Sequence, residues 1–271
     1  MNRRALILCA AVLAACGGDA NNYPMGALPY TPPVTKAAKW DLAWADEFDG
    51  TALDATSWIA VDGAVNVNNE LEYYTPSDVY LENGSLVLRS QQRTMGSRGY
   101  TSGEVRTGTK RTVRRGNAIE WRTQIPTGKG IWPANWLVNT PCDGIGGCGG
   151  SWPPEIDVME IRGSQPDNNI MTHWWGAYPN QQHQTSTYGG ATLSAGFHTY
   201  RLEWFADSIL WYIDGTQRAK HGSNITFGTL QLVMNTAVGG DFDGNPDATT
   251  VFPQYHRVDY VRVYRDTANV Y

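Results

Sequence analysis

Short runs in which apolar and polar residues alternate, separated by turn residues, most constrain the fold of this chain. Such runs extend over 119–125 and 200–204, and a third run, 209–213, ends at the turn residues Asp214-Gly215. Asn83-Gly84 separates two further short apolar runs. A period of two residues places alternate side chains on opposite faces of a strand, whereas no ten-residue segment has a helical period. Further strands are expected at 230–238 and 258–264.

We therefore predict an all-β fold, an antiparallel β-sandwich of the jelly-roll, concanavalin-like kind, with a concave groove for an extended substrate. A sandwich of this length forms one large core, so residues 39–271 are expected to be a single domain and a monomer. The net charge of −5 comes without any basic cluster. The composition therefore argues against a nucleic-acid partner and leaves a neutral polymer open.

The amino terminus has the features of an export signal. Arg3 and Arg4 precede an apolar run that is too short for a permanent membrane span, and Leu13-Ala14-Ala15-Cys16 follows. This segment resembles a bacterial lipoprotein signal peptide, which implies cleavage after residue 15 and a lipid anchor on Cys16. An ordinary secretory signal is the alternative. Residues 16–38 contain four prolines without apolar periodicity and are expected to form a flexible tether.

Three carboxylates lie close together in the apolar run 152–160, namely Glu155, Asp157 and Glu160. A regular strand would direct Glu160 into the packed layer with Ile156 and Val158, and an unpaired buried carboxylate costs several kcal/mol. One extra residue, a β-bulge near Val158, removes this conflict. We therefore expect all three acids on one face of the strand.

Three neighbouring acids repel one another, so at least one should keep its proton at neutral pH while another is ionised. A glycosidase needs such an acid and base pair. A carboxyl separation of about 5–5.5 Å would indicate a covalent, retaining mechanism. An acidic, solvated edge strand is the alternative interpretation of the same residues.

The segments around the acids resemble glycoside hydrolase family 16, in particular its laminarinase-like endo-β-1,3-glucanases. The resemblance rests on Glu155-Ile156-Asp157-Val158-Met159-Glu160, on Gly128 to Trp136 and on Val258 to Tyr264, and it extends from about Trp44 to Tyr264. It implies that Glu155 is the nucleophile, that Glu160 is the general acid and base, and that Asp157 tunes the pair. Other polysaccharides of the family, such as mixed-linkage glucan, agar or carrageenan, and a non-catalytic glucan-binding protein are the alternatives.

The resemblance also implies substrate contacts. Trp136 and Trp152 are expected to stack on sugar rings, with Trp132 a weaker candidate, because indoles pack well against apolar sugar faces. His173 occupies the place of a groove histidine, although a lone histidine is more often structural.

Two further contacts depend on the groove edge. Asn69 is expected to bind a sugar hydroxyl. Glu104 stands where relatives often have arginine, so Arg106 is expected to take over that contact.

Glu47, Asp259 and the backbone carbonyl of Gly84 resemble the ligands of a structural calcium ion, which prefers oxygen donors from several loops. The alternative is that both carboxylates bind arginines or cap turns. No cofactor is expected for catalysis, and no cysteine and histidine cluster has the spacing of a zinc site.

Once the signal is removed and Cys16 carries lipid, Cys142 and Cys148 are the two cysteines that remain. They flank a glycine-rich loop in an exported protein, where cysteines tend to be oxidised, so a disulfide is expected between them.

Overall fold

The computed structural model describes residues 36–140, 142, 145, 148, 151–190 and 192–271. The predicted signal peptide, Cys16 and nearly all of the predicted tether lie outside these residues.

One sheet, named here the back sheet, contains eight strands in the order β17-β16-β15-β10-β19-β6-β5, with β1 also paired to β19. Its strands are β1 (Trp40–Asp46), β5 (Val79–Glu82), β6 (Ser85–Ser90), β10 (Asn117–Gln124), β15 (Phe197–Trp204), β16 (Ile209–Ile213), β17 (Thr216–His221) and β19 (Gln254–Asp266).

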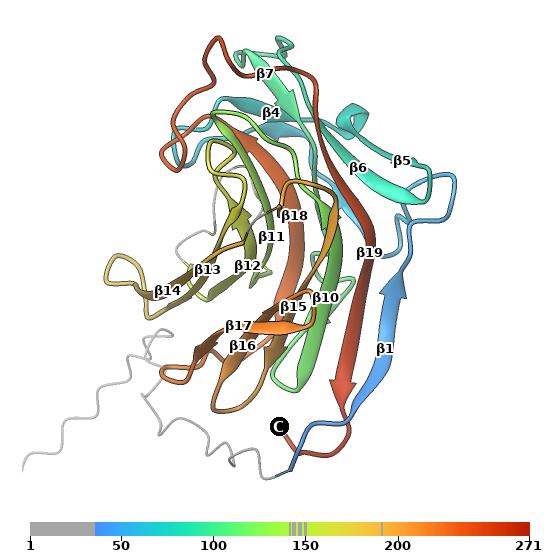
Figure 1. Ribbon diagram of the computed structural model, residues 1–271, viewed down its shortest axis with the longest axis vertical. Coiled ribbons are helices and arrows are strands. Elements are labelled where there is room, and N and C mark those ends of the chain that lie inside the picture. Colours follow the sequence, from blue (N-terminus) through green and yellow to red (C-terminus); the bar gives the residue numbers. More distant parts are fainter. Residues whose placement is uncertain (1–35, 141, 143–144, 146–147, 149–150, 191) are drawn as a thin grey trace, which may run out of the picture. The chain divides into compact units, whose positions relative to one another are not determined.

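The second sheet, named the groove sheet, also has eight strands, in the order β14-β13-β12-β11-β18-β8-β2, with β9 paired to β18. Its strands are β2 (Ile59–Ala60), β8 (Glu104–Arg106), β9 (Thr112–Val113), β11 (Ile131–Asn139), β12 (Glu155–Ile161), β13 (Asn168–Trp175), β14 (Gln182–Gly189) and β18 (Leu230–Val238). In Figure 1, β11 and β18 of this sheet run alongside β10 and β19 of the back sheet.

A small third sheet joins β3 (Gly63–Ala64), β4 (Glu72–Tyr74) and β7 (Tyr100–Ser102). The β4 and β7 strands are parallel, whereas all pairs in the two large sheets are antiparallel. Within the described residues, the helical structure is limited to one 3-10 turn, η1 (Pro76–Asp78). The fold thus confirms the predicted all-β antiparallel sandwich.

The predicted hairpins form at the turn residues. Asn83 and Gly84 have φ values of 52° and 72° between β5 and β6, and Asp214 and Gly215 have values of 50° and 71° between β16 and β17. Two successive residues in the left-handed region give the strand twist that a two-residue hairpin needs, and asparagine, aspartate and glycine tolerate this region best. The short-range sequence signals therefore position these four strands correctly.

The core lies between the two large sheets. One cluster of buried apolar side chains combines Trp121, Tyr200 and Val261 of the back sheet with Leu137 and Ile156 of the groove sheet. The tryptophans at positions 58, 121, 204 and 211 are fully buried. These four indoles belong to the core. Other aromatic side chains lie on the outer face of the groove sheet, where they are accessible from solution.

None of the described residues belongs to a helix that is long and apolar enough to span a membrane.

Candidate active site

A β-bulge in β12 brings the three predicted acids to one face. Asp157 pairs with Thr172 and Glu160 with Ile170, so two residues of β12 lie opposite one residue of β13. On the other side, the register with β11 shifts between Asn135 and Trp136. The extra residue confirms the predicted bulge near Val158.

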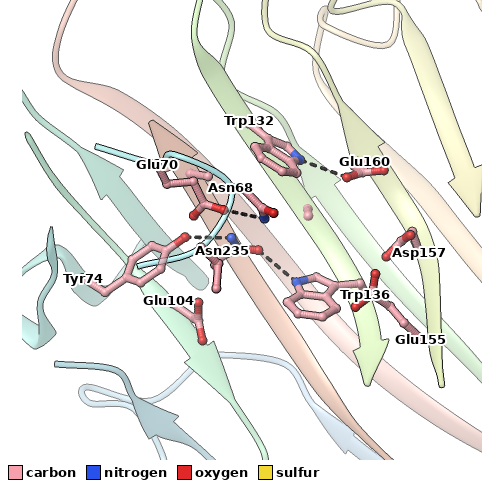
Figure 2. Close-up of a pocket in the computed structure, with 13 residues that line it drawn as sticks. Asn68, Glu70, Tyr74, Glu104, Trp132, Trp136, Glu155, Asp157, Glu160 and Asn235 are labelled. Atoms are coloured by element: carbon pink, nitrogen blue, oxygen red, sulfur yellow. Dashed lines mark hydrogen bonds between the residues drawn. The ribbon is translucent and has the colours of Figure 1, made fainter. Parts of the chain in front are cut away.

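The bulge separates the carboxylates from the apolar side chains of the same strand. Ile156 and Val158 are buried in the core, with exposures of 0% and 2%. Glu155, Asp157 and Glu160 instead line the same cavity on the outer face, as Figure 2 shows. The strand can therefore present three acids to a ligand without placing one in the core.

The cavity at the acids has a volume of about 120 Å³ and continues into a wider groove of about 1010 Å³. The groove crosses the outer face of β12, β13 and β14. Aromatic side chains line it, namely Trp132, Trp136, Trp152, Trp174, Tyr178, His183 and Phe242. An open, aromatic groove beside a carboxyl cluster suits an extended sugar polymer.

Glu155 lies at the start of β12 beside Trp152. The indole Nε1 of Trp152 donates a hydrogen bond of 2.9 Å to Glu155 Oε2. Burial raises the pKa of Glu155 to about 8, and the negative charge of Glu160 acts in the same direction, while the indole N–H opposes both. Trp152 therefore both lines the groove and donates a hydrogen bond to one of the acids.

Glu160 has an equivalent partner on β11. Trp132 Nε1 donates a hydrogen bond of 3.1 Å to Glu160 Oε1. Burial raises the pKa of Glu160 to about 7, whereas this hydrogen bond and the positive charge of Arg162 favour the ionised form. Each glutamate therefore has one indole N–H that stabilises its carboxylate.

Asp157 lies between the two glutamates and is 6% exposed. Burial, followed by the charges of Glu155 and Glu160, raises its pKa well above the usual range. Trp211 also donates from Nε1 to the backbone carbonyl of Asp157 at 2.8 Å, which fixes the strand at this point from the core side. The charge of each acid therefore affects the ionisation of its neighbours, which is the kind of interaction found in acid and base pairs.

The opposite wall of the cavity contains Glu70, which the sequence reasoning did not identify, and Glu104, which it identified only as a replacement for arginine. Glu70 and Glu104 line it, and both are nearly buried. Glu104 lies opposite Asn235 in the pairing of β8 with β18. Burial also raises the pKa of Glu70. Glu70, Glu72 and Tyr74 follow one another at a spacing of two, which is the sequence signal that they share a strand face.

A chain of hydrogen bonds fixes the orientation of Trp136 in this wall. Trp136 Nε1 donates to Asn235 Oδ1 at 3.0 Å, and Asn235 Nδ2 donates to Tyr74 Oη at 2.8 Å. Figure 2 shows this chain running across the cavity from Trp136 to Tyr74. Trp136 lies in the groove, as the sequence predicts, with its ring held from the β18 side.

The prediction for Asn69 is corrected by the structure. Asn69 is exposed, and its side-chain amide donates to Asp241 at 2.9 Å and 3.1 Å instead of lining the groove. Its neighbour Asn68 lines both cavities and donates to Glu70 at 2.9 Å. Both asparagines have a positive φ, and this turn directs the first side chain inward and the second outward.

The prediction for His173 is also corrected. His173 pairs with Ile156 and therefore lies on the core face of β13, with no exposed surface and with Nε2 at 2.9 Å from Thr226 Oγ1. Trp174, the next residue, pairs with Glu155 and lies in the groove, 5.2 Å from the ring centroid of Trp152. Because of this pairing register, Trp174 occupies the position in the groove that the sequence analysis assigned to His173.

Arg106 does not take over the contact expected of it. Its guanidinium donates to the carbonyl oxygen of Cys142 at 3.2 Å, and its side chain does not line the described groove. Glu104 is the residue of β8 that lines the cavity. The cavity wall on β8 therefore presents the acid Glu104 and not Arg106.

A disulfide joins Cys142 to Cys148, as expected from the sequence. Both cysteines line the wider groove, and they pack in one cluster with Trp136 and Trp152. The disulfide therefore supports two of the groove tryptophans.

The predicted calcium ligands have other partners. Arg262 binds Glu47 with two hydrogen bonds of 2.9 Å, and Arg122 binds Asp259 at 2.6 Å. The described residues contain no group of three or more acidic, cysteine or histidine side chains that could hold a metal ion. Both carboxylates follow the alternative, arginine-paired interpretation, so the donor set does not fit calcium as arranged, and a calcium site here stays a prediction.

Three comparisons with known proteins agree with this geometry. Residues 67–261 match the family model described as "Glycosyl hydrolases family 16". The chain is 34% identical to glucan endo-1,3-beta-glucosidase A1 of Niallia circulans, over 87% of this chain and 39% of that protein, so it spans about two fifths of that relative's length. It is also 34% identical to a beta-glucanase of Rhodothermus marinus, over 85% of this chain and 87% of that protein.

Among solved structures, the laminarinase catalytic domain of Thermotoga petrophila RKU-1 superposes with a TM-score of 0.75 and 32% identity. The match covers 85% of this chain and all of that domain. The bulged acid strand, the aromatic groove and these similarities lead to one conclusion: the chain belongs to glycosyl hydrolases family 16.

Proposed function

We propose that this protein is an endo-acting hydrolase of β-1,3-linked glucan that retains the anomeric configuration. The observation that carries the proposal is the set of Glu155, Asp157 and Glu160 on one face of β12, inside an aromatic groove. The similarity to a glucan endo-1,3-beta-glucosidase and to a laminarinase domain supports the choice of glucan. The wider groove, with a volume of about 1010 Å³, has room for a stretch of a polysaccharide chain, which favours cleavage within a chain.

In the proposed first step, a carboxylate oxygen of Glu155 attacks the anomeric carbon and forms a glycosyl ester. The bond from that carbon to the glycosidic oxygen breaks, and this oxygen takes the proton of Glu160. In the second step Glu160, now ionised, takes a proton from water, whose oxygen attacks the same carbon and releases Glu155. Two inversions give overall retention.

Each glutamate must therefore be ionised in one of the two steps. The indole N–H groups of Trp152 and Trp132 fit this requirement, because each favours the carboxylate form of one glutamate. Burial raises the pKa of both glutamates toward neutral pH, so each can gain or lose a proton there. The first step requires the proton on Glu160, so we propose that the arriving glycosidic oxygen keeps it there.

The charge of the cavity favours an uncharged glucan over a sulfated galactan such as carrageenan. Five carboxyl side chains line it, and the described lining residues include no lysine, arginine or histidine. The lining acids are Glu70, Glu104, Glu155, Asp157 and Glu160. A sulfate group keeps its negative charge near pH 7, so it would oppose the ionisation that Glu155 and Glu160 need in the two steps.

A purely glucan-binding function is less well supported, because both glutamates are present, line one cavity and have a pKa that burial raises toward neutral. A lectin needs neither the acid pair nor its raised pKa values. The groove geometry therefore favours the enzyme over the binding protein.

Replacement of the two glutamates tests the roles separately. Glu155→Ala should abolish cleavage of polysaccharide and be rescued by azide on an aryl glycoside, with product of inverted configuration. Glu160→Ala should still accept activated aryl glycosides and be rescued by azide with retained configuration. Product configuration, followed by NMR, decides between them. The opposite pair of outcomes would exchange the roles, and inverted product from the unaltered enzyme would refute the retaining mechanism.

We also propose that the protein is exported and anchored in the cell envelope through lipid on Cys16. The support is the lipobox-like sequence ending at Cys16 and the proline-containing segment that follows.

A further inference from the structure

Three side chains form a continuous stack beside Glu160. The guanidinium carbon of Arg162 lies 4.4 Å from the ring centroid of Phe242. The ring of Phe242 in turn stacks on Trp132, with centroids 4.6 Å apart and an interplanar angle of 25°. All three side chains line the wider groove, and Arg162 follows Glu160 by two residues, immediately after β12 ends.

The loop that carries Phe242 is held in place on both sides. Arg162 Nε donates to the backbone carbonyl of Phe242 at 2.7 Å. The neighbouring Asp243 is 5% exposed and accepts hydrogen bonds from the backbone N–H groups of Gly130, at 2.9 Å, and Ser164, at 3.1 Å. Gly130 immediately precedes β11, which carries Trp132. These hydrogen bonds attach the loop of Phe242 to the residue that precedes β11. The Phe242 ring and the Trp132 indole are thus held in place relative to each other.

This arrangement limits what Trp132 can do in the groove. One face of its indole is covered by Phe242, and its Nε1 donates to Glu160 at 3.1 Å. Figure 2 shows the indole edge turned toward Glu160. A ring with one face covered and its N–H committed is better suited to orient a carboxyl group than to serve as a sugar platform.

We propose that Phe242 and Arg162 are positioning residues, which hold the Trp132 indole so that its N–H orients the carboxyl group of Glu160 toward the leaving oxygen. The inference rests on the proposed role of Glu160 as general acid. Neither residue needs to touch the reacting atoms. Their effect passes through the single hydrogen bond from Trp132.

Substrates with different leaving groups provide the test. An oligoglucoside with a dinitrophenyl leaving group departs without protonation, whereas the oxygen of a glucan chain requires it. The value of kcat/KM depends only on the steps up to and including the first irreversible step. For both substrates that step is the cleavage of the glycosidic bond, so kcat/KM reports this cleavage. We expect Phe242→Ala to reduce kcat/KM on β-1,3-glucan by about tenfold or more, part of the factor that general acid catalysis contributes. On the dinitrophenyl substrate the fall should be about twofold or less.

Two variants serve as controls for this comparison. Phe242→Tyr keeps an aromatic ring in the stack and should restore activity on glucan. Phe227→Ala removes another phenylalanine that lies under an arginine, Arg115, with 5.9 Å between the guanidinium carbon and the ring centroid, but outside the groove. It should leave the ratio of the two kcat/KM values unchanged.

A double-variant cycle tests whether the effect passes through Trp132. Trp132→Phe removes the N–H, so adding Phe242→Ala to it should cause little further loss on glucan. Additive losses, or an equal fall on both substrates after Phe242→Ala, would overturn the inference. Absence of glucan cleavage by the unaltered enzyme would instead refute the proposed function, so the two failures are distinguishable.

Discussion

Replacing Glu155 by glutamine should stabilise the fold while it abolishes catalysis. Burial raises the pKa of this carboxyl group from 4.5 to about 8. The folded protein therefore binds more protons than the unfolded chain between these two values. The stability that this proton contributes is complete below the unfolded pKa and is lost as the pH rises toward 8.

The size of the effect follows from the interval between the unfolded pKa and the working pH. At pH 7 this interval is about 2.5 pH units, and each unit corresponds to about 1.4 kcal/mol, so the proton that Glu155 takes up on folding costs about 3 kcal/mol of stability. Glutamine has a similar shape and its carbonyl oxygen can still accept the hydrogen bond from Trp152. A gain of about 3 kcal/mol in a domain of this size raises Tm by roughly 6–12 °C.

Thermal or denaturant unfolding of both proteins at several values between pH 5 and pH 8 measures this effect. The stability difference between Glu155→Gln and the unaltered protein should grow with pH. Glu82→Gln is the matched control, because Glu82 is exposed and bound to Arg257 at 2.7 Å, a pair worth about 1 kcal/mol or less. A glutamine variant at 155 that is no more stable at pH 7, or a difference that stays constant with pH, would refute the reasoning.

Three further predictions concern other parts of the molecule. Reduction of the Cys142–Cys148 disulfide should cost about 2 kcal/mol of stability, measured by unfolding with and without reductant; equal midpoints would contradict this expectation. At a pH high enough to ionise these buried acids, Glu70→Gln and Glu104→Gln should each raise kcat/KM on carboxymethylated glucan relative to neutral glucan by about tenfold, since like charges in the cavity oppose an anionic sugar. An unchanged ratio in reducing-sugar assays would show that these acids do not select against charge. Cys16→Ser should move the protein from the detergent phase to the aqueous phase on partitioning; an unaltered protein already in the aqueous phase would exclude the anchor.

Local chemistry accounts for the parts of the fold that could be predicted from the sequence. The strands on either side of Asn83-Gly84 follow from turn residues that accept a positive φ. The bulge in β12 follows from the cost of burying Glu160 with Ile156 and Val158, and it forms where that cost requires it. Both arguments involve only residues within a few positions of one another.

The strand β14 (Gln182–Gly189) shows where such reasoning ends. Its sequence is mostly polar and has no apolar alternation, yet it pairs along its whole length with β13 and borders the groove. Backbone hydrogen bonds to the neighbouring strand form this element, and they require no particular side chains.

The sequence by itself determined the sandwich class, the face of the three acids and the pair of cysteines that form the disulfide. Only the tertiary structure decided that Trp174 and not His173 faces the groove, because a shift of one residue in the pairing of β13 with β12 would exchange the two faces. It also placed Glu104 in the cavity wall that faces the three acids of β12, through pairing with β18 across more than a hundred residues. Strand periodicity is set by neighbouring residues, whereas register and the residues that meet across a groove depend on contacts between distant segments.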